Sequence, residues 1–181
     1  MKNTRRQTGF TLIEMMVTVG LVSILLSVGV PSFREFIKDG ALTAGNNELV
    51  TAFNLARSEA VKRGARVTVC KSANQTACTT SDGWEKGWLI FTDENNNGVY
   101  DSANETLIRV HGAMAASITA VGNGTVINYV SYVMSGKSQQ VPSGLQSGTI
   151  LVSDDRVGPY GKNLNISQTG RISTVAGVTV P

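Results

Sequence analysis

A long apolar stretch near the N-terminus constrains this chain more than any other feature. Between residues 10 and 30 the only charged side chain is Glu14, and basic residues precede the stretch within residues 1–9. A helix over residues 10–30 is about 31 Å long at about 1.5 Å per residue, close to the ~30 Å apolar core of a bilayer. The sequence therefore predicts a single-pass membrane helix, with the basic residues in the cytoplasm and the remaining chain outside it.

Two simpler interpretations of this stretch are a cleaved secretory signal and a plain membrane anchor. A secretory signal has a shorter apolar region and a small-residue cleavage site directly after it. Here the stretch Ala41-Leu42-Thr43-Ala44-Gly45, which contains small residues, comes only after Pro31 and a charged segment. A plain anchor leaves Glu14 unexplained, because a carboxylate is costly at membrane depth and normally marks function. Glu14 is therefore a candidate functional residue.

The residues Gly9-Phe10-Thr11-Leu12-Ile13-Glu14 resemble the class III signal of type IV pilins and type II secretion pseudopilins. The resemblance implies that a prepilin peptidase cuts between Gly9 and Phe10 and that the new amine on Phe10 is N-methylated. It also implies that Glu14 of an incoming subunit pairs with the terminal amine of a neighbour in the filament. Because Glu14 lies one turn from Phe10 on the same helix face, a bond to the amine of its own chain is the alternative.

The same resemblance implies a location and a set of partners. The chain would be held in the bacterial inner membrane by its helix, with the C-terminal domain in the periplasm, and would then enter a pilus or pseudopilus. Its expected partners are other pilins or pseudopilins along the N-terminal helix, the prepilin peptidase and an inner-membrane assembly platform.

The helix should kink at Pro31, which removes a backbone donor and clashes with the preceding turn, and then resume. Apolar residues at positions 49, 53, 56 and 60 follow i, i+4, i+7, i+11 spacing and predict one buried helix face. Gly64 predicts the helix C-terminus. Basic residues gather near this end, either as a solvated helix end or as a patch for an acidic partner: Arg57, Lys62, Arg63, Arg66 and Lys71.

From residue 65 onward the sequence has strand patterns without intervening helical periodicity, which predicts antiparallel sheets. The expected strands are 65–70, 88–91, 106–110, 126–134, 149–152, 163–167 and 171–175, with turn signals at 122–124, 142–144 and 158–159. The strand 88–91 is expected to be buried on both faces or nearly so. The expected fold class is α+β and, by the resemblance, pilin-like, with a long N-terminal helix packed on antiparallel sheet.

The sequence thus predicts four segments. They are a leader (1–9), a transmembrane helix (10–30), its amphipathic continuation (31–64) and a β-rich globular domain (65–181). Removal of the leader lowers the basic residues from 16 to 13, equal to the 13 acidic ones, so the basic pI of the precursor is no argument for nucleic-acid binding.

Cys70 and Cys78 are the only cysteines. A pair of cysteines outside the inner membrane should form a disulfide, which in so small a loop contributes at most about 2–3 kcal/mol. A zinc site is not expected, because the single histidine, His111, is distant in sequence and there is no second cysteine pair.

The segment from Cys70 to Asp101, with its Gly-Trp pairs, Phe-x-Asp and Asn-Gly, resembles the region after the first strand in the FimT/FimU minor pilins and the related type II secretion pseudopilin H. With the N-terminal signal, the resemblance covers roughly residues 8–112. It implies a minor pilin of a type IV pilus or, as the alternative, pseudopilin H of a type II secretion system. We favour the pilus, although both machines use the same signal and anchor.

Asp93-x-Asn95-x-Asn97-Gly98 begins like an EF-hand calcium loop, with Asp101 at the ninth position. The twelfth position, where a bidentate glutamate is required, is Asn104, and Glu105 is one residue late. The other interpretation is a hairpin whose Asn-Gly turn supplies positive φ. We expect the turn and no cofactor, with calcium as the weaker alternative.

Other activities have little support in the sequence. A catalytic triad needs a histidine beside a serine and a carboxylate, and no phosphate-binding glycine loop is present, so we do not expect an enzyme. Some relatives grip DNA through a Gly-Arg-x-Arg stretch. Here Gly170 and Arg171 are followed by serine in place of the second arginine, with Lys162 and Arg156 as nearby cations. A DNA-uptake pilin is therefore a weaker alternative.

Overall fold

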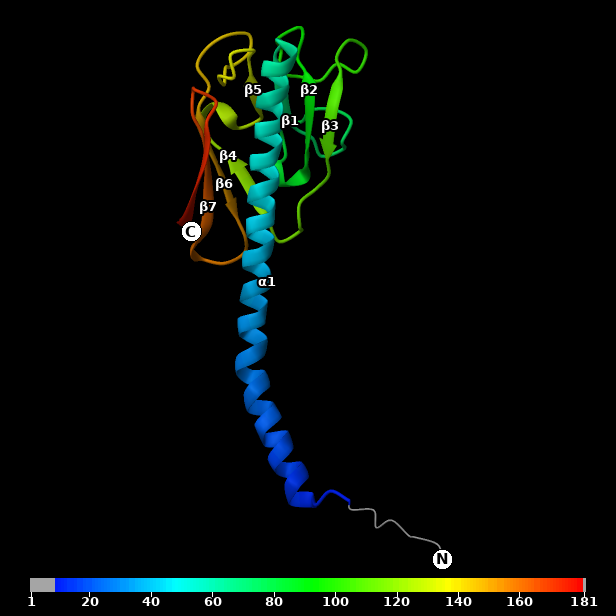
Figure 1. The fold of residues 1–181 in the computed structure, drawn as a ribbon, viewed down its shortest axis with the longest axis vertical. Coiled ribbons are helices and arrows are strands. Elements are labelled where there is room, and N and C mark those ends of the chain that lie inside the picture. The colour runs from blue at the N-terminus through cyan, green and yellow to red at the C-terminus, as the bar shows by residue number, and fades with distance from the viewer. Residues whose placement is uncertain (1–8, 181) are drawn as a thin grey trace, which may run out of the picture. The chain divides into compact units, whose positions relative to one another are not determined.

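The computed structural model describes residues 9–180, so the leader residues Lys2, Arg5 and Arg6 lie outside the described part. A single α-helix precedes all of the strands (Figure 1). The elements are α1 (Leu12–Arg63), β1 (Val67–Lys71), η1 (Trp84–Lys86), β2 (Trp88–Thr92), β3 (Leu107–His111), β4 (Thr119–Gly122), η2 (Gly124–Val126), β5 (Tyr129–Tyr132), β6 (Gly148–Ser153), β7 (Gly158–Ile166) and β8 (Ile172–Val180), where η1 and η2 are 3-10 turns.

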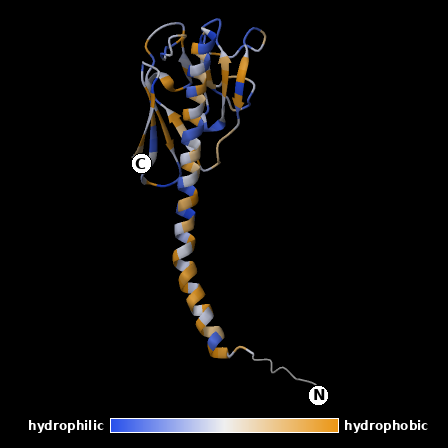
Figure 2. Ribbon diagram, viewed as in Figure 1, coloured by the Kyte–Doolittle hydropathy of each residue, from blue (hydrophilic) through white to orange (hydrophobic). Residues whose placement is uncertain are grey.

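The chain divides into two compact units, one ending at Lys38 and the other beginning at Asp39. In the first unit α1 is strongly apolar, as its colouring in Figure 2 shows, and has the length and composition of a membrane-spanning helix. A signal sequence near the N-terminus meets the same criterion. Pro31 lies inside α1, whose helical backbone continues on both sides, and the kink itself stays a prediction.

In the second unit α1 buries the face that its apolar spacing predicts. Leu49, Phe53, Ala56 and Ala60 have no exposed surface. The helix ends at Arg63, and the next residue, Gly64, has a φ of +64°, the left-handed conformation of a glycine C-cap. The predicted helix end is therefore confirmed.

The strands form two antiparallel sheets, in the orders β3-β2-β1-β5 and β4-β6-β7-β8. The predicted α+β class is confirmed, with differences in detail. Within residues 126–134, Val126 is the last residue of η2 and only Tyr129–Tyr132 form a strand, β5, and the predicted turn at 158–159 is instead the start of β7. The short strand β4 was not predicted. Only Ala120 of its four residues is buried, so the segment is too short to show the alternation of a strand.

The last strand, β8, is at an edge of the second sheet and pairs only with β7. Its pairing is irregular: Gly161 pairs with Val178 but Lys162 pairs with Ala176, which leaves Gly177 as an extra residue. Gly177 has a φ of +77°. The edge strand therefore contains a β-bulge at a glycine.

One apolar core joins α1 to both sheets. Phe53 meets Trp84 edge-to-face with ring centroids 5.4 Å apart, and the Trp84 indole donates a 3.1 Å hydrogen bond to the Val126 carbonyl. A second, small cluster of Cys70, Leu89 and Phe91 lies apart from this core and is covered by Tyr100 and Tyr129, among others. All residues of β1 and β2 are consequently buried, as predicted for 88–91.

Candidate functional site

The start of α1 is held by a reciprocal pair of contacts. The backbone N–H of Thr11 donates to the Glu14 carboxylate at 3.5 Å, and the N–H of Glu14 donates to the Thr11 hydroxyl at 3.3 Å. This is a capping box, and Glu14 also lies where the helix dipole favours negative charge. Sequence reasoning missed the role of Thr11, although Thr-x-x-Glu before an apolar run is the signal that reveals it.

The residues around the predicted cleavage point are exposed. Phe10 is 78% exposed, and the large apolar residues of the first unit are also exposed: Leu12, Ile13, Met15, Met16, Val17, Val19, Leu21, Val22, Ile24, Leu25, Leu26, Val28, Val30, Phe33, Phe36 and Ile37. So large an apolar surface marks a contact with lipid or with another protein. The first unit is therefore the candidate assembly surface.

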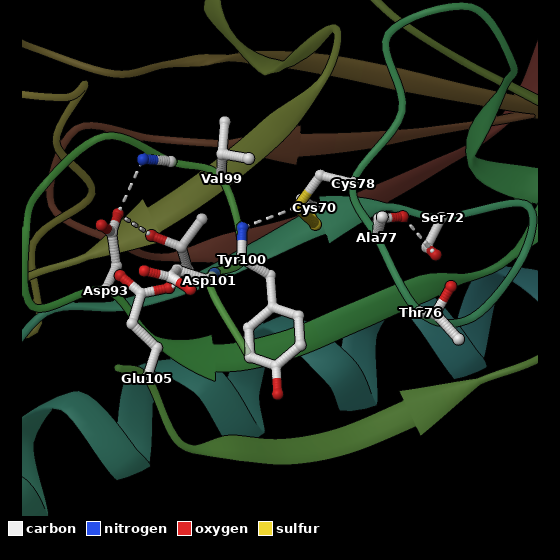
Figure 3. Close-up of a disulfide and its surroundings, with 12 residues drawn as sticks. Cys70, Ser72, Thr76, Ala77, Cys78, Asp93, Val99, Tyr100, Asp101 and Glu105 are labelled. Atoms are coloured by element: carbon white, nitrogen blue, oxygen red, sulfur yellow. Dashed lines mark hydrogen bonds between the residues drawn. A yellow bond between two sulfur atoms is a disulfide. The ribbon is translucent and has the colours of Figure 1, made fainter. Parts of the chain in front are cut away.

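Cys70 and Cys78 form the predicted disulfide, at the end of β1 (Figure 3). The loop that it closes is also held internally, because the Ser72 hydroxyl donates to the Ala77 carbonyl at 2.7 Å. The backbone N–H of Tyr100 donates to the Cys78 Sγ at 3.3 Å, which links this loop to the segment after β2. The disulfide thus has a structural role: it holds the loop and Tyr100, which pack on the second cluster.

The segment after β2 is organised by Asp93, which is fully buried. Its carboxylate accepts hydrogen bonds from the Thr68 hydroxyl at 2.8 Å and from the backbone N–H groups of Asn97 and Gly98 at 3.0 and 3.1 Å. Gly98 has a φ of +72°, as the predicted Asn-Gly turn requires. The turn interpretation therefore accounts for the backbone of this segment.

The side chains of the calcium motif also fold the loop. The amide oxygens of Asn95 and Asn97 accept the N–H groups of Asn97 and Val99 at 3.1 and 2.7 Å, and Asp101 accepts the N–H of Ala103 at 3.0 Å. Within residues 9–180 no three histidine, cysteine or acidic side chains form a group that could hold a metal.

The basic residues near the end of α1 do not form one surface patch. The Arg66 guanidinium is buried and donates to Ser131, Gln139, Pro142 and others, and burial lowers its pKa. Lys71 is buried as well, and burial lowers its pKa despite the opposing charges of Asp82 and Glu85. Both predicted interpretations of the basic cluster, a solvated helix end and a patch for an acidic partner, therefore fail for Arg66 and Lys71, which are buried.

The candidate DNA-binding residues are separated along the β7–β8 hairpin. Lys162 pairs with Ala176, whereas Arg171 comes just before Ile172, which pairs with Ile166. At about 3.4 Å per residue this places the two cations roughly 14 Å apart or more along the strands. The Lys162 ammonium donates to the Thr43 hydroxyl at 2.7 Å. The structure does not bring the two residues together as a phosphate clamp.

His111 lines a groove between α1 and the β2–β3 edge. Its ring stacks on Trp88 with centroids 4.1 Å apart, and its Nε2 lies 3.8 Å from the Glu48 carboxylate. The rest of the lining consists of Ala44, Asn47, Thr51, Ala52 and Arg109. Among the described residues, no serine lines this groove.

Comparison with known proteins identifies the family. A sequence model described as Type II transport protein GspH matches residues 46–170, which is most of the chain. The chain belongs to the GspH family. A second model, described as the prokaryotic N-terminal methylation motif, matches residues 4–30 of this GspH-family chain and includes Gly9, Phe10 and Glu14.

Curated relatives carry the names of pilus proteins. Fimbrial protein Q of Moraxella bovis is 29% identical over 105 residues, which are 56% of the GspH-family chain and 66% of that protein. Prepilin peptidase-dependent protein D of Escherichia coli is 45% identical over 38 residues, 21% of this chain and 26% of that protein. The chain therefore spans from about a quarter to two thirds of these relatives.

Solved structures give the fold. The crystal structure of the type IV minor pilin FimU of Pseudomonas aeruginosa matches with a TM-score of 0.59 and 24% identity, covering 81% of this chain and 96% of that one. The predicted pilin-like fold and the predicted family are both confirmed.

Proposed function

We propose that this chain is a minor subunit of a type IV pilus that helps to initiate or decorate the filament. The observation that carries the proposal is the first unit of α1, where apolar side chains are exposed and Glu14 occupies the first turn. Such a surface is satisfied by a bilayer and equally by a bundle of neighbouring helices. The subunit can therefore leave the membrane for the filament without exposing its helix to water.

Glu14 is suited to a change of partner during assembly. Its present contact with the Thr11 N–H is 3.5 Å long, at the weak end of the hydrogen-bond range. After cleavage behind Gly9, the methylated amine of Phe10 on a neighbouring subunit offers a charge-assisted partner in an apolar setting, where an unpaired carboxylate is costly. The pair would set the axial position of the incoming subunit.

The proposal places the helix in the inner membrane with the β-rich domain in the periplasm. Residues 1–9 meet the prepilin peptidase on the cytoplasmic side, and an inner-membrane assembly platform moves the processed subunit into the filament. The GspH family membership and the methylation motif support this arrangement.

Mass spectrometry and filament preparation test the proposal. The chain purified from membranes of cells with active processing should begin at a methylated Phe10, and Glu14→Gln should be processed but absent from sheared filaments. Glu35→Gln, the same change further along α1, is the matched control and should be incorporated. A chain that retains its initiator methionine, or equal incorporation of the Glu14→Gln variant, contradicts the proposal.

Pseudopilin H of a type II secretion system is the second candidate, favoured by the description of the matching family. Deletion of the gene separates the two. Loss of surface pili and of surface motility with intact protein secretion supports the pilus subunit, whereas loss of secretion with normal pili supports the pseudopilin.

A further inference from the structure

Glu105, just before β3, has a buried carboxylate that is only half satisfied. The residue is 7% exposed, and its Oε2 accepts a 2.9 Å hydrogen bond from the backbone N–H of Asp101. Its Oε1 is buried and has no hydrogen-bond partner. A buried carboxylate oxygen without a partner is costly, so this position calls for a ligand that the protein does not itself supply.

The surroundings of Glu105 are negative. The carboxylates of Asp93 and Asp101 add negative charge beside the Glu105 carboxylate. Figure 3 shows the three side chains gathered beside the loop that follows β2. The charge of Asp93 acts on Arg66, but the hydrogen bonds of Arg66 go to neutral oxygens, among them that of Asn96.

We propose that this loop binds a calcium ion through the carboxylates of Asp93 and Glu105 and the amide oxygens of Asn95 and Asn97. Calcium takes six to eight oxygen ligands in flexible geometry, and these side chains supply that type of ligand. Carbonyl oxygens of the loop and water complete the coordination.

The offset of Glu105 from the EF-hand position is resolved by the turn that precedes it. The backbone N–H groups of Asn104 and Glu105 both donate to the Asp101 carbonyl, at 3.2 and 2.9 Å. This tight turn takes up one residue and returns Glu105 to the loop. The thirteenth residue can therefore serve where an EF-hand uses the twelfth.

The hydrogen bonds already present leave room for an ion. Each carboxylate or amide oxygen has two lone pairs. Oδ2 of Asp93 already accepts two hydrogen bonds, whereas Oδ1 of Asp93 and the amide oxygens of Asn95 and Asn97 each accept one backbone N–H. Two of the four side-chain ligands are amides, which agrees with the finding that the described acidic residues form no ready three-acid cage. The low ligand charge predicts weak affinity, with a Kd of about 10⁻⁴–10⁻³ M, as in extracellular calcium modules.

Thermal unfolding of the full chain in detergent tests the site, with calcium, magnesium or a chelator present. Calcium at about ten times its Kd should raise the Tm by a few degrees, and magnesium should raise it less because it demands stricter geometry. Glu105→Gln should lose the calcium response and, in the chelator, should be at least as stable as the wild type because the unpaired charge is gone.

Glu94→Gln is the matched control, since Glu94 is an exposed residue of the same loop and the change removes the same charge. This variant should keep the calcium response. The absence of a calcium-dependent Tm change in the wild type up to 10 mM, or an equal loss of response in both variants, overturns the proposal.

Discussion

Arg156, in the turn between β6 and β7, forms a 2.8 Å ion pair with Asp39 of α1. The same guanidinium binds the buried carboxylate of Asp154 at 2.7 Å and lies over the Tyr160 ring, 4.2 Å from its centroid. Arg156 is itself almost fully buried, whereas Asp39 is largely exposed. Arg156 is therefore held by contacts within the second unit.

Replacement of Arg156 by alanine should be strongly destabilising. The variant leaves the Asp154 carboxylate buried without its counter-charge, a defect that costs about 3–5 kcal/mol. Asp39→Asn removes only the exposed partner and should cost about 0–1 kcal/mol. Urea unfolding of the full chain in detergent measures both. Equal losses in the two variants would contradict the central role of Asp154.

Removal of the disulfide should lower stability by about 2–3 kcal/mol, the chain-entropy value for a short loop. The double variant Cys70→Ala with Cys78→Ala leaves no free thiol, and its urea midpoint should match that of the wild type treated with reductant. A midpoint unchanged by reductant would show that the bonds within the loop suffice without the crosslink.

Lys71→Met should alter the pH dependence of stability in the alkaline range. Burial lowers the pKa of Lys71 in the folded state below the ordinary 10.5, so between these values the unfolded state binds more protons. Wild-type stability therefore rises with pH in that window, and the stability of the wild type relative to the variant should increase as the pH rises toward 10.5. Lys62→Met, at an exposed site, is the control and should show no such trend.

Gly170→Ala should be among the most damaging single changes in the second unit. Gly170 has a φ of +75°, and an added Cβ would meet the Gly136 carbonyl oxygen, itself the acceptor for Arg57. We expect the free energy of unfolding to fall by more than about 2 kcal/mol, because backbone strain and a steric clash both contribute.

Gly177→Ala is the matched comparison for that change. Gly177 has a similar φ of +77° but open space around it, so only the conformational cost of about 1 kcal/mol applies. Melting temperatures of the two variants measure the difference. If they fell together, the contact at Gly136 would be unimportant.

The sequence predicted those parts of the fold that depend on local pattern. The buried face of α1, its end at Gly64 and the buried strand β2 follow from spacing and glycine conformation. The strand β4 was missed because its four residues have no strand pattern of their own. The strand is held by its backbone pairing with β6. Long-range pairing of this kind leaves no periodic signal in a short segment.

The candidate site divides in the same way. The motif from Gly9 to Glu14 was recognisable because its residues are consecutive. The burial of Arg66 was not recognisable, because it depends on segments around Ser131 and Gln139 that are distant in sequence. The role of Glu105 was also hidden, since a fixed residue count cannot register the turn at Asp101.

The bulge at Gly177 affects how copies of this domain interact when they lie close together. An open edge strand invites a second chain to add a strand, and continued addition leads to aggregates. Displacement of one residue in β8 interrupts the row of backbone groups that an invading strand would have to match. Crowded copies of this domain can thus touch without fusing their sheets.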